Sequence, residues 1–86
     1  MHWLYVLRCA DNSLYIGETS DVDHRVAKHN DGSSAFTAAR RPVNLVYTEM
    51  FENRLLALRR ERQIKRWTRA KKEALVLGNK SVLRRL

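Results

Sequence analysis

The stretch that decides the fold is WLYVLRCADNSLYIGE, residues 3–18. Residues 3–9 are rich in aromatic and branched apolar side chains, which is typical of a strand, and residues 14–18 form a second run of this kind. The residues between the two runs, Ala10-Asp11-Asn12-Ser13, are of types that favour a turn. The stretch therefore predicts a β-hairpin.

The hairpin register determines which side chains share a face of the sheet. A three-residue loop over residues 10–12 places Leu7 opposite Tyr15 and Tyr5 opposite Gly17. Because side chains alternate between the two faces of a strand, both tyrosines then lie on one face as diagonal neighbours. Gly17 has no side chain, so we expect open space beside Tyr5.

Helix and strand signals alternate in the rest of the chain. Residues 19–21, Asn53 and Thr68 are of types that cap helix starts, whereas Gly32 and Gly78 are helix stop signals. The expected elements are a helix over residues 21–30, a polar loop over residues 33–41, a strand over residues 43–50, a helix over residues 53–67 and a helix over residues 69–77, followed by a basic tail. The order β-β-α-β-α-α predicts the α+β class, with a small three-stranded, largely antiparallel sheet flanked by helices.

Length and composition limit the class of protein. The chain has 86 residues, 44% of them hydrophobic, which is enough for one domain over residues 1–86 and too few for two separate cores. The longest apolar run, residues 3–7, is far shorter than the roughly 20 residues that span a bilayer. The single cysteine, Cys9, cannot form an internal disulfide. We therefore expect a cytoplasmic protein with no membrane segment.

The charge is large and unevenly distributed. The net charge is +8 and the sequence pI is about 10.4. Residues 1–39 carry three basic and five acidic side chains, whereas residues 40–86 carry 14 basic and 4 acidic ones. A basic surface of this strength favours a polyanionic partner, nucleic acid before an anionic membrane.

Few residues offer chemistry. The sequence contains no zinc, phosphate-loop, dinucleotide or Ser-His-Asp signature. What remains is the pair of tyrosines, Arg25 and His29 four residues apart on one helix, and Glu61 at the edge of an apolar helical stripe. Each of these residues taken alone is more typical of packing or of a solvated helix face than of a catalytic site.

Five sequence elements together resemble the GIY-YIG endonuclease family, in its short stand-alone bacterial branch. They are Trp3-Leu4-Tyr5, Tyr15-Ile16-Gly17, the helix segment from Arg25 to His29, and the segments over residues 41–47 and 57–67. The resemblance covers residues 3–77. It implies a divalent-metal-dependent endonuclease that hydrolyses phosphodiester bonds in DNA and recognises backbone or structure rather than a long sequence.

The resemblance also implies roles for five side chains. Tyr5, Tyr15, Arg25, His29 and Glu61 match the catalytic positions of the family, and Glu61 would hold one Mg²⁺ or Mn²⁺ ion. A single carboxylate suffices for such an ion when phosphate oxygens complete its shell. Arg25 would stabilise the negative charge of the transition state, and Tyr15 would position the phosphate or the water. Either Tyr5 or His29 could accept the proton from water.

The sequence departs from the family pattern at three places. Many larger members have an asparagine beyond the glutamate, and no residue of this sequence is assigned to that role. The first motif reads Trp-Leu-Tyr instead of Gly-Ile-Tyr, and the loop over residues 33–39 lacks the lysine, tyrosine and arginine expected near its threonine. Basic residues that we expect to contact nucleic acid lie on several elements: Lys28, Arg40, Arg41, Lys65, Arg66, Arg69, Lys71 and Lys72.

Expected partners are DNA, with RNA as an alternative, and a protein specificity factor. A place near the bacterial nucleoid and a role in DNA repair follow from this interpretation. Two other interpretations remain: a non-catalytic nucleic-acid-binding module that keeps the fold, and a domain whose basic helices bind an acidic protein. Glu61 also has an alternative role, an ion pair with Lys65 one helical turn away.

Overall fold

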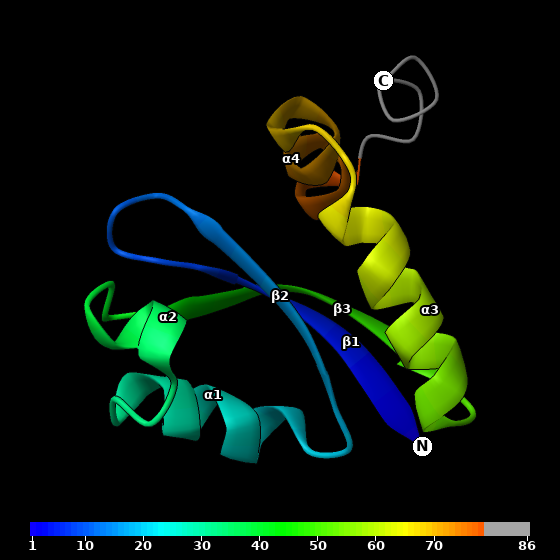
Figure 1. Cartoon of the computed structure of the whole chain (residues 1–86), viewed down its shortest axis with the longest axis horizontal. Helices are drawn as coiled ribbons and strands as arrows, with labels where there is room; N and C mark the ends of the chain where they lie inside the picture. Colours follow the sequence, from blue (N-terminus) through cyan, green and yellow to red (C-terminus); the bar gives the residue numbers. More distant parts are fainter. Residues whose placement is uncertain (79–86) are drawn as a thin grey trace.

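A computed structural model describes residues 1–78 of the chain (Figure 1). Its elements are β1 (His2–Arg8), β2 (Leu14–Thr19), α1 (Val22–Asn30), α2 (Ala35–Ala38), β3 (Asn44–Phe51), α3 (Arg54–Lys65) and α4 (Arg69–Leu77). The strands form one antiparallel sheet in the order β2-β1-β3, which confirms the predicted α+β class. The segment expected to be a polar loop contains the short helix α2. The predicted basic tail lies outside the described residues.

The hairpin has the predicted register. Tyr5 pairs with Gly17 and Leu7 with Tyr15. The amide of Cys9 donates to the carbonyl of Ser13 at 2.9 Å, which closes a three-residue loop. Asn12 in this loop has a φ of 71°, a left-handed conformation that asparagine adopts more readily than most residues.

The space beside Gly17 is filled by Tyr5 itself. A Cβ atom at position 17 would lie 2.5 Å from the Tyr5 hydroxyl and 2.6 Å from its Cζ. The tyrosine ring therefore crosses the backbone of β2 in direct contact, and only 1% of Tyr5 is exposed. The expectation of open space was wrong because the ring folds over the strand.

The two faces of the sheet have different partners. Leu4 and Val6 of β1 face Ile64 of α3 and Leu75 of α4 in one apolar cluster. Tyr5 and Leu7 of β1 form a second cluster with residues from β2, α1 and the segments next to β1 and β3: Cys9, Tyr15, Val26 and Val43. Figure 1 shows α1 and α2 on one side of the sheet and α3 and α4 on the other. Among residues 1–78, no helix is long and apolar enough to cross a bilayer.

The ends of the helices follow the capping signals in the sequence. Asp21 accepts from the amide of His24 at 3.0 Å, Asn53 from that of Leu56 at 3.0 Å, and Thr68 from that of Lys71 at 3.2 Å. Each bond satisfies one of the amides that a helix start leaves unpaired. Gly78 ends α4 in the left-handed conformation, with φ 73°. Three of the predicted helices therefore start where their caps indicate.

A bidentate ion pair connects α4 to the sheet. The guanidinium of Arg8 on β1 donates to both carboxylate oxygens of Glu73, at 2.7 and 2.6 Å. Arg8 also donates to the side chain of Asn12 in the hairpin loop at 3.2 Å. The N-terminal strand and the last described helix are thus held together at the hairpin end of the sheet.

The close contact of Tyr5 with Gly17 predicts a large effect of a small substitution. Gly17→Ala should lower the free energy of unfolding by about 1–3 kcal/mol, because the added methyl group overlaps the Tyr5 ring. Urea unfolding of both chains measures the difference. In a Tyr5→Ala background the same substitution should cost much less, and an equal cost in both backgrounds would show that the ring is not the cause.

Candidate active site

The tyrosine of the first strand and the histidine of α1 form a buried polar pair. The Tyr5 hydroxyl lies 2.9 Å from Nε2 of His29, and His29 is 2% exposed. Nδ1 of the same ring lies 2.8 Å from Oγ1 of Thr37, which is fully buried on α2. Three polar side chains from β1, α1 and α2 therefore form one continuous hydrogen-bonded chain.

Tyr15 packs against this chain on the side facing solvent. Its ring centroid lies 4.8 Å from that of His29 and 6.2 Å from that of Tyr5. Phe36 of α2 packs on Tyr15, with 5.6 Å between the centroids. Tyr15 is half-buried and forms part of the wall of an open hollow.

The hollow beside Tyr15 is basic. It has a volume of about 330 Å³, and its other lining residues come from α1 and from the segment that follows it: His24, Arg25, Lys28, His29, Ser33 and Ser34. This volume is near the lower end of the roughly 300–1,000 Å³ of ligand sites, and the hollow is open. It can admit one segment of a large anionic ligand. Arg25 also lines a second hollow beside Glu18 and Arg54.

The protonation states at the site follow from burial and from neighbouring charges. Burial, more than any other cause, raises the pKa of Tyr5 far above its usual value; Tyr15 and Glu61 raise it further, and the Arg25 guanidinium opposes the shift. Burial and, to a smaller extent, Arg25 lower the pKa of His29. At neutral pH Tyr5 is a neutral phenol and His29 a neutral imidazole that can accept a proton.

Glu61 lies on α3, on the other side of the sheet from α1 and α2. Its side chain is 14% exposed on α3, and one carboxylate oxygen lies 3.1 Å from Nζ of Lys65. Its negative charge is one of the causes that raise the pKa of Tyr5. Within residues 1–78, no three or more histidine, cysteine or carboxylate side chains are grouped so that they could hold a metal ion. The residues present suit a cation held by one carboxylate and by the phosphate of a substrate.

The structure thus brings the five predicted catalytic side chains to one region. Tyr5 lies at its centre, bonded to His29, packed near Tyr15, and within the electrostatic influence of Arg25 and Glu61.

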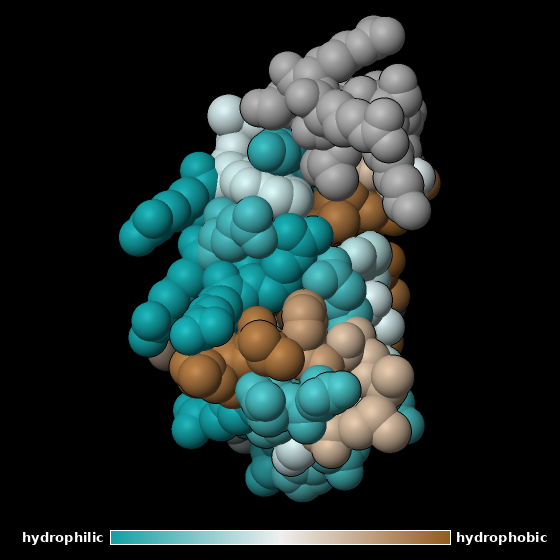
Figure 2. Space-filling model, turned by 90° about the vertical axis from the view of Figure 1, so that its right-hand side faces the viewer, coloured by the Kyte–Doolittle hydropathy of each residue, from teal (hydrophilic) through white to brown (hydrophobic). Residues whose placement is uncertain are grey.

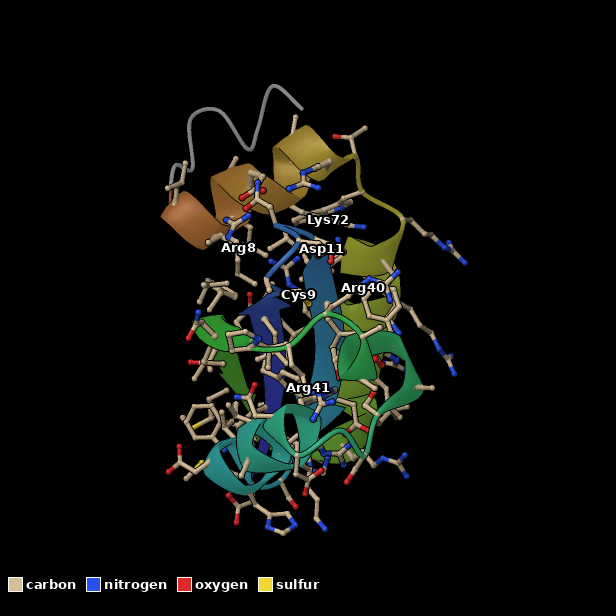
Figure 3. The ribbon with its side chains drawn as sticks, turned by 90° about the vertical axis from the view of Figure 1, so that its left-hand side faces the viewer. Arg8, Cys9, Asp11, Arg40, Arg41 and Lys72 are labelled. Carbon is tan, nitrogen blue, oxygen red and sulfur yellow. The ribbon has the colours of Figure 1, made fainter. Side chains whose placement is uncertain are left out.

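The eight predicted nucleic-acid contacts are more dispersed. Lys28 lines the basic hollow with Arg25. Arg69, Lys71 and Lys72 lie on α4. Arg69 donates to the carbonyl of Asn12 in the hairpin loop, and Figure 3 shows Lys72 in the region of that loop. Several of the predicted contacts are engaged within the protein: Arg40 with Asp11, Arg41 with the Ala38 carbonyl, Lys65 with Glu61, Arg69 with Glu73, and Lys71 over the Trp67 ring.

Sequence reasoning missed two groups of residues. Arg59 and Arg62 line a shallow hollow on α3 together with the predicted Arg66 and with Gln63 and Trp67. Their spacing of three and four residues on one predicted helix could have identified them. Thr37 and Phe36 could not be identified in this way, because α2 has one turn and its N-cap, Ser34, makes no side-chain capping bond.

Comparison with known proteins places the chain among small bacterial proteins. The model of the GIY-YIG catalytic domain matches residues 1–74. UPF0213 proteins of Staphylococcus aureus strains Mu3 and Mu50 are 51% identical over 76 residues, which cover 87% of this chain and 93% of theirs.

Two solved structures have the same fold. The solution structure of the UPF0213 protein BH0048 from Bacillus halodurans is 42% identical, with a TM-score of 0.60 over 91% of this chain and 84% of that one. The protein EF2693 from E. faecalis is 40% identical, with a TM-score of 0.62 over 90% and 83% of the two chains.

The lowered pKa of His29 predicts a pH dependence of stability. The unfolded chain takes up a proton on this residue at a higher pH than the folded chain does. The free energy of unfolding should therefore fall as the pH drops through about 6.5, by at most about 1.4 kcal/mol per pH unit. Urea unfolding between about pH 7.5 and 5.5 measures this slope. A His29→Gln chain should lose that part of the slope, and an unchanged slope would contradict the assignment.

Proposed function

This chain belongs to the GIY-YIG nuclease family, and we propose that it is a divalent-metal-dependent endonuclease that hydrolyses phosphodiester bonds in DNA. The observation that carries the proposal is the buried hydrogen bond between Tyr5 and His29, because His29 also lines a basic hollow. Hydrolysis of a phosphodiester needs a proton acceptor for water and positive charge for the phosphate. Both are present here, and we propose that residues 1–86 act as one nuclease domain.

His29 is the final proton acceptor in this proposal, and Tyr5 transmits the proton. A phenol with a raised pKa is a poor base, so a phenolate does not start the reaction. Instead, the Tyr5 oxygen takes a proton from the attacking water while its own proton moves to Nε2 of His29 across 2.9 Å. The water oxygen forms its bond to phosphorus as the bond to the leaving oxygen breaks, and the leaving oxygen takes a proton from solvent.

The remaining site residues bind and orient the phosphate. Arg25 and Lys28 line the hollow and supply positive charge, and Arg25 stabilises the negative charge that develops in the transition state. The Tyr15 hydroxyl positions the phosphate or the attacking water. Glu61 is the protein ligand for one Mg²⁺ or Mn²⁺ ion. When bound, this ion neutralises charge on the scissile phosphate and on the leaving oxygen.

The substrate is recognised through its backbone or its shape. The hollow is open and lined by basic and hydroxyl side chains, which suits phosphate contacts rather than the reading of base edges. Any preference for one DNA sequence would then come from a protein specificity factor. Such a nuclease would act on DNA in the bacterial cytoplasm, at the nucleoid, for instance in DNA repair.

Cleavage assays test the proposal together with the role of Glu61. The protein should cut labelled duplex, flap or single-stranded DNA in Mg²⁺ or Mn²⁺ and not in EDTA. Glu61→Gln should abolish this activity at saturating DNA, because the amide keeps the volume of the side chain and removes the charge that the cation needs.

Lys65→Gln breaks the same ion pair and is the matched control. Both variants should lose only about 0.3–0.5 kcal/mol of stability, the usual contribution of such a pair on a helix. At saturating DNA only Glu61→Gln should lose metal-dependent cleavage, because a lost phosphate contact at Lys65 weakens binding and not the chemical step. A Glu61→Gln chain that nicks DNA at the parent rate would refute the metal assignment and favour a non-catalytic binding module. Cleavage of RNA but not of DNA would identify RNA as the substrate instead.

A row of arginines along α3 and at its C-cap predicts how DNA binding depends on salt concentration. Arg59, Arg62 and Arg66 line one hollow and, within residues 1–78, make no ion pair, whereas Arg54 on the same helix pairs with Glu18 at 3.4 Å. Each phosphate contact contributes about 0.9 to the slope of log affinity against log salt. Arg62→Gln should therefore make the slope shallower by about that amount, measured by fluorescence anisotropy. Arg54→Gln removes the same charge, and an equal effect would show that only net charge matters.

A further inference from the structure

The hydroxyl group of Thr37 is one of the few polar groups buried completely in this protein. It lies at the end of the polar chain, 2.8 Å from Nδ1 of His29, on a helix that contributes no group to the walls of the basic hollow. Its Oγ1 is also 3.5 Å from the carbonyl oxygen of Ser34, three residues earlier. This is the usual contact of a threonine hydroxyl with the preceding turn of its own helix.

Both contacts of the Thr37 hydroxyl are hydrogen bonds at the same time in only one arrangement of the hydrogens. Because a carbonyl oxygen can only accept, the hydroxyl hydrogen points to Ser34 in that arrangement. The lone pairs of Oγ1 then face Nδ1 of His29, and this nitrogen must carry the ring hydrogen to complete the bond. In a neutral imidazole the second nitrogen, Nε2, is then free to accept.

The hydrogen bond between Tyr5 and His29, at the other end of the polar chain, favours the same tautomer of His29. An imidazole nitrogen is a stronger base than a phenol oxygen, so the bond between Tyr5 and His29 is best made with the phenol as donor. The donors therefore follow one direction, from Tyr5 to His29, from His29 to Thr37, and from Thr37 to the Ser34 carbonyl.

We propose that Thr37 is a positioning residue that fixes His29 in the tautomer with its hydrogen on Nδ1, so that Nε2 faces Tyr5 as a proton acceptor. The proposal rests on the proposed nuclease function for its catalytic consequence, because Nε2 is the atom that receives the proton there. With the opposite tautomer, Nε2 already carries a hydrogen and cannot take the proton of Tyr5. Thr37 itself touches neither the water nor the phosphate.

Contacts outside the site hold α2 in the position that this role requires. The guanidinium of Arg40 donates to the carbonyl of Phe36 at 2.6 Å, and it lies 4.1 Å from the centroid of the Phe36 ring. The same guanidinium lies 3.1 Å from the carboxylate of Asp11 in the hairpin loop, and Figure 3 shows both residues near the loop. Arg40, which the sequence placed among the nucleic-acid contacts, thus anchors the helix that carries Thr37.

The tautomer of His29 can be measured without any nuclease assay. Two-bond ¹H–¹⁵N NMR correlations of the imidazole ring distinguish hydrogen on Nδ1 from hydrogen on Nε2. The parent chain should show the Nδ1 form at neutral pH, as should Thr37→Ser, which keeps the hydroxyl. Thr37→Val keeps the shape and removes the acceptor, so its ring should shift toward the Nε2 form.

Thr19→Val is the matched control for this measurement. Thr19 is also a buried threonine with two short-range hydrogen bonds, and it makes no hydrogen bond to His29. The substitution should lower stability and leave the tautomer of His29 unchanged. A change of tautomer in this control would mean that any loss of a buried hydroxyl disturbs the ring, and it would overturn the proposal.

Kinetics supply the second readout. Thr37→Val should lower kcat by about 10- to 100-fold, the size of effect known for groups that orient a functional histidine, and leave KM for DNA nearly unchanged. Thr37→Ser should restore most of the rate. Equal losses in Thr37→Ser and Thr37→Val would indicate a role in packing only and would overturn the proposal.

The two readouts separate failure of this inference from failure of the proposed function. A parent chain with hydrogen on Nε2, or a Thr37→Val chain that keeps the Nδ1 form, overturns the positioning role whatever the activity. A chain with the expected tautomers that cuts no nucleic acid supports the role of Thr37 in setting the tautomer and overturns the nuclease assignment.

Discussion

The central strand β1 has to bury both of its faces, and most of the structure follows from how it does so. Leu4 and Val6 on one face pack against α3 and α4 in an ordinary apolar core. Tyr5 on the opposite face is buried to the same degree, yet it carries a hydroxyl group that needs a partner. His29 supplies that partner, and Thr37 in turn satisfies the other nitrogen of His29. The hydroxyl group of Tyr5, in the middle of the sheet, thus depends on partners from both α1 and α2, the two helices on this side of the sheet.

The parts of the fold that could be predicted are those that depend on neighbours in sequence. The hairpin register followed from loop length and alternation, and it correctly placed Tyr5 and Tyr15 on one face. The starts of α1, α3 and α4 followed from their capping residues. The helix α2 could not be predicted, because it is held by contacts with a loop far away in the sequence, through Arg40 and Asp11. For the same reason the sequence did not indicate that Thr37 belongs to the polar chain.

The distribution of ion pairs explains why basic residues could not be sorted from sequence alone. Asp11, Glu18, Glu49, Glu61 and Glu73 each take at least one basic partner, and several of these pairs join distant segments. In the described part of the chain, Arg59, Arg62 and Arg66 make no such pairs, and neither do the basic residues of the hollow beside Tyr15. Their positive charge therefore stays available to a polyanion. Figure 2 shows a strongly hydrophilic area next to an apolar band on the side of the molecule where α3 lies.

The burial of Cys9, which directly follows β1, has a consequence for the chemistry of the whole chain. Its thiol is 3% exposed, within the same cluster as Leu7 and Val43. Thiol reagents and oxidants attack an accessible sulfur, and the sulfur of Cys9 is shielded from solvent. The sequence contains no other cysteine. The folded protein should therefore be indifferent to the redox state of its surroundings, and a cysteine introduced at an exposed position would be its single site for labelling.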